Sequence, residues 1–225
     1  MRSRALGVVV LIACWSAKGG SGTTVVSVAL AAVLARSSPS GALLADLAGD
    51  VPAVLGVADP SGPGLAEWLA SGEGVPADAL TRLEVGGPGA LRVLPAGEAA
   101  TEEPGRAEVL AAALAADPRP VVVDCGSNLR GAALAVAAAA STSLLVLRPC
   151  YLSLRRALQS PVRPSGLVVV SEPGRALGRR DVEEVLGVPV RAFVGVDPAI
   201  ARAVDAGLLP TRLPRGLERA LRHAA

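Results

Sequence analysis

Short apolar runs alternate with segments of helix length along the whole chain, and this alternation restricts the possible folds more than any other feature. Leu6–Cys14 is a continuous apolar run, as expected of a strand buried on both faces of a sheet. Further strands are predicted at Ala42–Ala45, Ala90–Leu94, Pro120–Val123, Leu144–Leu147, Leu167–Val170 and Val188–Val194. Helices are predicted at Thr23–Arg36, Gly64–Ala70, Pro76–Leu83, Glu103–Ala116, Leu129–Ala140, Arg179–Leu186, Pro198–Ala206 and Leu217–His223. Such an alternation predicts an α/β fold of three layers, in which helices flank a doubly wound, mostly parallel sheet.

The length and composition fit this prediction. The chain has 225 residues, and no internal repeat or long linker divides it, so residues 1–225 are predicted to form a single domain. Apolar residues make up 51% of the chain and aromatic residues only 2%, so the core must consist mainly of Val, Leu and Ala. Cys14, Cys125 and Cys150 show no disulfide or zinc spacing and are expected to be core residues. The single histidine, His223, lies two residues before the end of the chain, which excludes chemistry that needs a positioned imidazole.

Three polar features follow predicted strands. The first strand leads into the loop AKGGSGTT, the second strand ends at Asp46, and a later strand ends at Asp124. Ligands of doubly wound sheets bind at the carboxyl ends of the strands, so we expect these features to meet at one edge of the sheet. Glycines allow backbone N–H groups to surround phosphate oxygens, and the following helix directs its positive end at the same anion. The predicted phosphate cradle consists of Gly19, Gly20, Ser21, Gly22, Thr23 and Thr24.

The first residues also fit a different pattern. MRSRALGVVV followed by LIAC is similar to a bacterial lipoprotein signal, with a basic start, an apolar run and then Cys14. Cleavage before Cys14 would remove the first strand from the sheet, so we favour the strand. The apolar segment 131–147 is rich in Ala, is interrupted by polar residues and is shorter than the roughly 20 residues that a membrane span needs. A soluble, cytoplasmic protein is therefore expected.

The glycine loop departs from the usual phosphate-binding pattern. That pattern, G-x-x-x-x-G-K-[ST], ends in a lysine for the β- and γ-phosphates and a hydroxyl for magnesium. Here Thr23 occupies the lysine position and Thr24 the hydroxyl position, while Lys18, the only lysine in the chain, lies five residues before Thr23. This arrangement resembles the deviant Walker A motif, KGGxGKT, of the ParA/MinD family of P-loop ATPases.

The resemblance covers nearly the whole chain. LLADLAGDVPAVLG resembles the family's DxD-like segment after its second strand, LRVLPAG its strand and LPAG turn, and VVVDCGSN its Walker B strand. STSLLVLRPCYLSLRRA resembles the strand and helix that follow, and VDPAIARAVDAGLL a segment near the family's C-terminus. The spacing of DLAGD and the GTT ending of the loop look closest to the TadZ/CpaE and septum-site-determining branch, which serves pilus placement or division. The resemblance implies a P-loop NTPase-like fold that binds ATP or ADP with Mg²⁺.

By position, the resemblance assigns roles to four residues. Lys18 corresponds to the lysine that reaches across a homodimer to the nucleotide of the partner. Thr24 and Asp124 correspond to the magnesium shell, and Asp46 is their neighbour on the second strand.

Two departures from the family concern catalysis. Thr23 replaces the in-place lysine, and Ala48 stands where the family carries the Asp that orients the attacking water. Asp50 is the candidate substitute, but a shift of two residues moves a carboxylate by several ångströms, and a turn residue or helix cap is the favoured interpretation of Asp50. Phosphoryl transfer depends on positioned charge, so we expect a pseudo-ATPase in which hydrolysis is weak or lost.

The leading hypothesis is a spatial regulator that binds nucleotide, dimerises and recruits a protein partner of a pilus, division or partition apparatus. One alternative is an active ATPase in which Asp50 compensates for Ala48. The other is a scaffold whose loop holds no nucleotide.

The last third of the chain is basic. Residues 148–225 hold 13 basic and 7 acidic side chains, whereas residues 1–147 hold 9 and 13. We expect at most weak, salt-sensitive DNA binding, to which Arg155 and Arg156 contribute. MinD-type relatives end in an amphipathic helix that lies on lipid, but two leucines bury too little apolar area for a stable anchor, so membrane binding is not expected. The apolar face of the corresponding helix here consists of Leu217, Ala220, Leu221 and Ala224.

Overall fold

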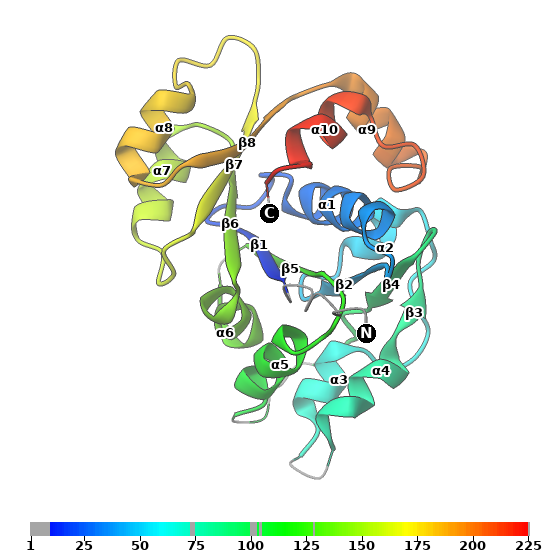
Figure 1. The fold of residues 1–225 in the computed structure, drawn as a ribbon. Helices are drawn as coiled ribbons and strands as arrows, with labels where there is room; N and C mark the ends of the chain where they lie inside the picture. The colour runs from blue at the N-terminus through cyan, green and yellow to red at the C-terminus, as the bar shows by residue number, and fades with distance from the viewer. Residues whose placement is uncertain (1–9, 73–74, 100–102, 104, 128, 225) are drawn as a thin grey trace, which may run out of the picture.

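The computed structural model describes residues 10–72, 75–99, 103, 105–127 and 129–224. Within these ranges the strands form one eight-stranded sheet in the order β3-β4-β2-β5-β1-β6-β7-β8 (Figure 1). Neighbouring strands run parallel, except that β3 is antiparallel to β4. The strands are β1 (Leu11–Ser16), β2 (Ala42–Asp46), β3 (Val85–Gly86), β4 (Leu91–Leu94), β5 (Val121–Ser127), β6 (Thr142–Leu147), β7 (Gly166–Ser171) and β8 (Val190–Gly195).

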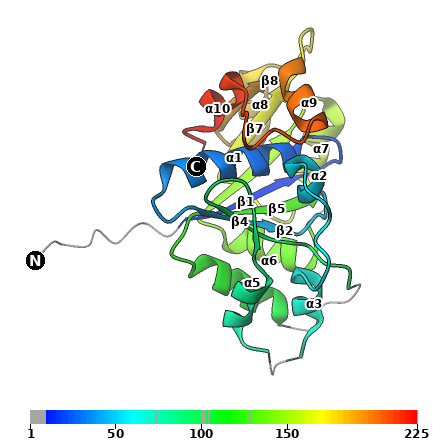
Figure 2. The same cartoon turned by 90° about the vertical axis from the view of Figure 1, so that its right-hand side faces the viewer.

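Helices cover both faces of the sheet, as Figures 1 and 2 show. One layer contains α1 (Thr23–Ser37), α2 (Val51–Leu55), α9 (Pro198–Asp205) and α10 (Arg215–Leu221). The other contains α3 (Leu65–Ala70), α4 (Leu80–Leu83), α5 (Arg106–Ala115), α6 (Gly131–Ala139), α7 (Tyr151–Leu158) and α8 (Arg179–Leu186), with a 3₁₀ turn, η1 (Ala77–Ala79), before α4. Alternate residues of β1 enter the two cores, with Ile12 and Cys14 in the first and Ala13 and Trp15 in the second. The predicted three-layer fold with a mostly parallel sheet is confirmed.

Helix α1 is buried on two sides, which explains its nearly continuous apolar sequence. It packs on β1, β2 and β5, and α2 and α10 in turn cover it. Val26, Val28 and Leu30 are among its buried side chains. Because α1 follows the glycine loop directly, this packing also fixes the position of that loop.

The two central strands extend further than predicted. β1 ends at Ser16 rather than Cys14, and β5 ends at Ser127 rather than Val123, because Ser16 pairs with Ser127 across a register shift. Residues 6–9 of the first predicted strand lie outside the described residues. Asp124 therefore lies within β5 instead of directly after it.

Periodicity does not predict the shortest elements. α2 and β3 contain five and two residues, which is too few for a period to be recognised. The helix that the family resemblance implies within STSLLVLRPCYLSLRRA is present as α7, directly after β6. α5 begins at Arg106 rather than Glu103, directly after Gly105, which adopts a left-handed conformation with φ 79°.

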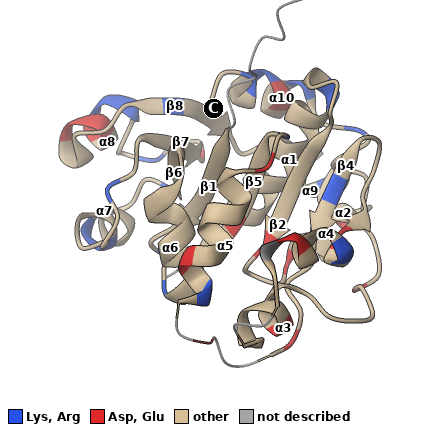
Figure 3. Ribbon diagram, turned by 60° about the horizontal axis from the view of Figure 1, so that its bottom comes forward, with Lys and Arg blue, Asp and Glu red and all other residues tan. Residues whose placement is uncertain are grey.

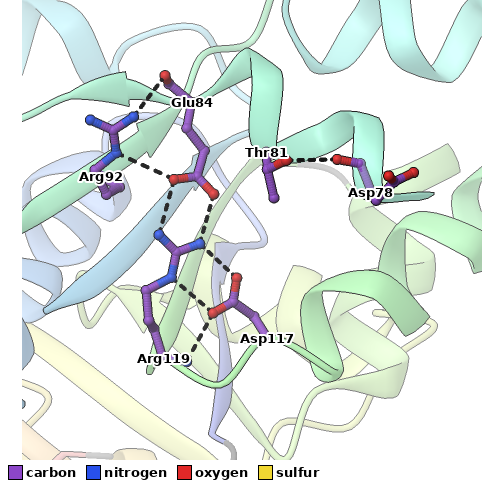
Figure 4. Close-up of polar contacts among 6 residues, drawn as sticks. All are labelled: Asp78, Thr81, Glu84, Arg92, Asp117 and Arg119. Atoms are coloured by element: carbon purple, nitrogen blue, oxygen red, sulfur yellow. Dashed lines mark hydrogen bonds and ion pairs between the residues drawn. The ribbon is translucent and has the colours of Figure 1, made fainter. Parts of the chain in front are cut away.

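A network of ion pairs joins the antiparallel edge to the middle of the sheet (Figure 4). Arg119, just before β5, donates hydrogen bonds of 2.9 and 2.7 Å to the carboxylate of Glu84. It donates two more, of 2.9 and 2.7 Å, to the carboxylate of Asp117. Arg92 of β4 adds an ion pair with Glu84 at 3.3 Å. Only 8–18% of the Glu84, Asp117 and Arg119 side chains is exposed, so this network is a largely buried connection at the amino end of β5.

Candidate functional site

A cavity of about 610 Å³ opens at the carboxyl ends of β1, β2 and β5. Its walls are the glycine loop with the start of α1, the turn between β2 and α2, part of α2 itself, and the end of β5. The predicted meeting of the loop and the strand ends at one edge of the sheet is confirmed. The lining residues are Ser16, Gly19, Gly20, Ser21, Gly22, Thr23, Thr24, Val25, Leu47, Ala48, Asp50, Ala53, Val54, Cys125, Gly126 and Ser127.

Two left-handed glycines and two hydroxyls shape the glycine loop. Gly20 and Gly22 have φ angles of 76° and 89°, a conformation that other residues rarely adopt. The hydroxyls of Ser16 and Ser21 both donate to the carbonyl oxygen of Lys18, at 3.0 and 2.8 Å. Gly22 is the N-cap of the 15-residue helix α1, so the first free N–H groups of that helix lie at the cavity and favour an anion there. This is the backbone arrangement of a phosphate cradle.

Asp124 places a buried carboxyl group beside the loop. It pairs in register with Cys14 of β1 and Asp46 of β2, and its side chain is fully buried. Its Oδ1 accepts the N–H of Gly126 at 3.1 Å, whereas its Oδ2 has no hydrogen-bond partner among the residues that the structure describes. Burial raises the pKa of Asp124 to about 6, although the Thr24 hydroxyl and the Gly126 N–H act in the opposite direction.

Thr24 and Asp124 fit one side of a magnesium site. Mg²⁺ prefers oxygen ligands and keeps several waters. Here the Thr24 hydroxyl lies beside the buried carboxyl group of Asp124, one oxygen of which has no hydrogen-bond partner in the described part of the chain. In the described part of the chain, no group of three or more His, Cys, Asp or Glu side chains could hold a metal ion. A magnesium ion at this position would therefore depend on further oxygens from water or a bound phosphate.

Asp46 fixes the turn that follows β2. Its Oδ1 accepts the N–H groups of Ala48 and Gly49 at 2.9 and 2.7 Å, and its Oδ2 accepts the N–H of Val51 at 3.1 Å. Burial raises the pKa of Asp46, and the same three hydrogen bonds lower it. Asp46 does not line the 610 Å³ cavity. Both of its carboxylate oxygens accept hydrogen bonds from the main chain, so Asp46 positions the turn.

The residues at the departures from the family also lie at the cavity. Thr23, Ala48 and Asp50 all line it. Asp50 is the N-cap residue of α2, but its carboxylate makes no capping hydrogen bond and remains exposed. Lys18 is half-buried and does not line the cavity, and among the described residues no hydrogen bond or ion pair to its side chain is found.

Several lining residues lie outside the sequence predictions. Ala53 and Val54 belong to α2, and the short apolar run after Asp50 was the only signal for that helix. Cys125 lines the cavity as well, but burial raises the pKa of its thiol well above the ordinary value. Burial likewise raises the pKa of Cys14 to about 12, so both thiols stay protonated near neutral pH.

Comparisons with known proteins give structural matches without sequence matches. No protein-family model matches the chain. No curated protein matches it either. A ParA family ATPase from Chlorobium tepidum TLS superimposes with a TM-score of 0.77 at 20% identity, over 95% of this chain and 96% of the other.

Two structures that contain MinD show the same similarity. The septum site-determining protein MinD from Pyrococcus horikoshii OT3, complexed with Mg-ADP, has a TM-score of 0.72 at 20% identity, over 95% of this chain and 93% of the other. The MinC:MinD cell division protein complex from Aquifex aeolicus gives a TM-score of 0.73 at 18% identity, over 95% and 93%. The glycine loop, the strand order and these superpositions agree: the chain has the fold of the ParA/MinD family of ATPases.

Proposed function

We propose that the protein binds ATP or ADP together with Mg²⁺ at the glycine loop. The observation that carries this proposal is the buried carboxyl group of Asp124, which interacts with the Thr24 hydroxyl and whose Oδ2 has no hydrogen-bond partner among the described residues. A buried carboxylate oxygen is costly unless a ligand completes its surroundings. Thr24 and Asp124 would hold the ion or its water shell, and the loop N–H groups would hold the phosphates. Bound Mg²⁺ would supply positive charge to the β- and γ-phosphates. The presence of Mg-ADP in a MinD of the same fold supports this choice of ligands.

Hydrolysis is weak or lost in this proposal. Thr23 carries no charge with which to stabilise the phosphates, and Ala48 carries no group that could orient a water. Asp50 lines the same cavity with an exposed carboxylate, which favours the active ATPase as the second candidate.

We further propose a homodimer that recruits a protein partner in the cytoplasm for positioning a pilus, a septum or a chromosome. The Lys18 side chain makes no observed contact within the described residues and lies outside its own cavity, which suits a role toward a second copy. The MinC:MinD complex supports a protein partner. None of the helices in the described part of the chain is long and apolar enough to span a membrane.

Two measurements test this function. The first is equilibrium binding of a fluorescent ATP analogue with and without millimolar Mg²⁺, and the second is phosphate release from ATP. Magnesium-dependent binding without turnover is the expected result. Turnover that disappears in Asp50→Ala would establish the active ATPase, and absence of binding with Mg²⁺ present would establish the scaffold. Thr24→Ala should lose the magnesium dependence, whereas Thr81→Ala should keep it, because Thr81 belongs to α4 in the other helical layer and does not line the cavity.

A further inference from the structure

Helix α2 connects the candidate nucleotide cavity to a second helix, α9. The N-cap of α2, Asp50, and two of its residues, Ala53 and Val54, line the cavity. The helix is five residues long, and its C-cap residue, Gly56, contacts Gly207, which lies just after α9. α9 and α2 lie in the same helical layer and contact each other, and Figures 1 and 2 show them as neighbours.

Gly56 and Gly207 contact each other backbone to backbone. Both adopt a left-handed conformation, with φ angles of 69° and 65°. A Cβ atom added to Gly207 would lie 2.6 Å from the Cα of Gly56, and one added to Gly56 would overlap the Cα, carbonyl carbon and oxygen of Gly207. Packed side chains rarely tolerate such proximity, so neither residue can carry a side chain without displacing the other helix.

Helix α2 is held as a rigid unit between its two ends. At the start, the N–H of Val51 donates to Asp46, and the side chains of Val51 and Leu55 are buried in the core. At the end, the N–H of Val57 donates to the carbonyl of Pro52 at 3.1 Å, which closes the last turn around Gly56. A displacement of α2 at the cavity must therefore reach the contact with Gly207.

Helix α9 is less firmly attached than the other parts of this layer. None of its residues is fully buried, and Ile200, Ala203 and Val204 only partly enter the core. Two exposed apolar residues directly follow the glycines, Val57 with 46% and Leu208 with 37% of its surface exposed. Elements with few buried contacts are the ones that yield first, so a shift of α2 is absorbed by α9 and changes the surface around Val57 and Leu208.

We propose that α2 is a rigid relay that couples occupancy of the cavity to the position of α9 through the contact between Gly56 and Gly207. The relay rests on the proposed function, because nucleotide is its ligand. A nucleotide that shifts Ala53 and Val54 displaces α9. Conversely, a change at the glycine contact alters nucleotide affinity, since coupling between two sites is reciprocal.

Hydrogen–deuterium exchange of the wild-type protein tests the relay directly. Addition of Mg²⁺ and ATP should change the rate of amide exchange in residues 197–209 by about fivefold or more, although these residues do not line the cavity. Nucleotide binding that leaves exchange in 197–209 unchanged would overturn the relay while the proposed function stands.

Gly207→Ala tests the contact itself, and Gly174→Ala is the matched control. Gly174 has a similar φ of 79°, but a Cβ there meets nothing within 4 Å, so the control carries the backbone strain without the clash. Gly207→Ala should weaken ATP binding by about 5- to 100-fold and speed exchange in Val51–Leu55 of the nucleotide-free protein, whereas Gly174→Ala should do neither.

The exchange measurement on the wild type and the comparison of the two variants distinguish failure of the relay from failure of the proposed function. If the wild type binds no nucleotide, the proposed function fails, and exchange in nucleotide-free α2 still decides the contact: equal rates in the two variants would disprove the relay. If Gly207→Ala does not fold, the wild-type exchange measurement alone decides.

Discussion

At the scale of single residues, two neighbouring buried carboxylates have opposite surroundings. Asp46 and Asp124 pair in register on β2 and β5, and burial raises the pKa of both. Asp46 accepts three main-chain N–H groups, whereas Oδ2 of Asp124 has no hydrogen-bond partner within the described ranges. Asp46 therefore builds the turn, and Asp124 keeps an oxygen available for a ligand at a cost to the free protein.

Asp124→Asn should stabilise the nucleotide-free protein by about 1–3 kcal/mol at pH 7–8, because it removes a buried charge. The raised pKa means that native wild type holds this proton more tightly than the unfolded chain, so stability falls as the pH rises from about 4 to 6. In Asp124→Asn, the contribution of Asp124 to this pH dependence of stability should disappear. Urea unfolding at several pH values measures both effects. Asp46→Asn is the contrasting variant, which should destabilise because a main-chain N–H loses its acceptor.

Thr23→Lys should return a cation to the β- and γ-phosphates and tighten ATP binding by roughly 1–3 kcal/mol, the value of a charge-assisted hydrogen bond. Turnover should stay poor, because Ala48 is unchanged. Titration calorimetry and phosphate release measure the two quantities. Weaker binding by Thr23→Lys would mean that the loop does not hold a triphosphate as proposed.

At the scale of elements, Arg119 fastens the β3–β4 edge to the chain before β5 (Figure 4). Arg119→Met leaves two largely buried carboxylates without their cation and should destabilise the fold by about 1–3 kcal/mol, without changing nucleotide affinity. Hydrogen bonds from Arg119 lower the pKa of Glu84, and they outweigh burial in lowering that of Asp117. The stabilisation is therefore present at neutral pH and is lost as the pH falls through the lowered pKa values.

Arg175→Met is the control for this variant, because its ion pair with Glu172 is exposed to solvent and should contribute little to stability. Chemical unfolding compares the two variants. Equal destabilisation would contradict the role given to the Arg119 network.

At the scale of the whole molecule, the C-terminal helix faces inward and the basic charge outward. Leu217, Leu221 and Ala224 are buried against the core beside α1 and β8, so the apolar face that lipid would need is already covered. Arg155 and Arg156 of α7 and Arg179 and Arg180 of α8 are exposed. The colours of the ribbon in Figure 3 show that α8 carries acidic as well as basic residues.

Co-sedimentation with anionic liposomes should be negligible, and DNA binding should be at most weak and salt-sensitive. The double variant Arg155→Ala, Arg156→Ala should reduce any DNA binding measured by fluorescence anisotropy. Firm liposome binding that is lost on truncation after Pro214 would show instead that α10 leaves the core and lies on lipid.

The sequence alone predicted the layers of the fold and the segments that meet at the cavity. Periods of burial determine whether a run becomes a strand or a helix, and the parallel arrangement then brings strand ends together. The sequence did not predict that Asp124 lies within β5, because the pairing of Ser16 with Ser127, which extends both strands, is a tertiary contact. The sequence did not predict α2 either, because a helix of five residues is too short to show a helical period.

At the level of single residues, the sequence determined the glycines of the loop, the absence of a lysine at position 23 and the absence of a carboxylate at position 48. The tertiary structure decided which polar atoms keep their partners. Both oxygens of Asp46 accept main-chain N–H groups, whereas Oδ2 of Asp124 has no hydrogen-bond partner in the part of the chain that the structure describes, although both residues follow or end a run of apolar residues in the same way. It also decided that Gly56 meets Gly207, some 150 residues away in sequence. Contacts of this kind depend on the packing of whole helices, and no short stretch of sequence encodes them.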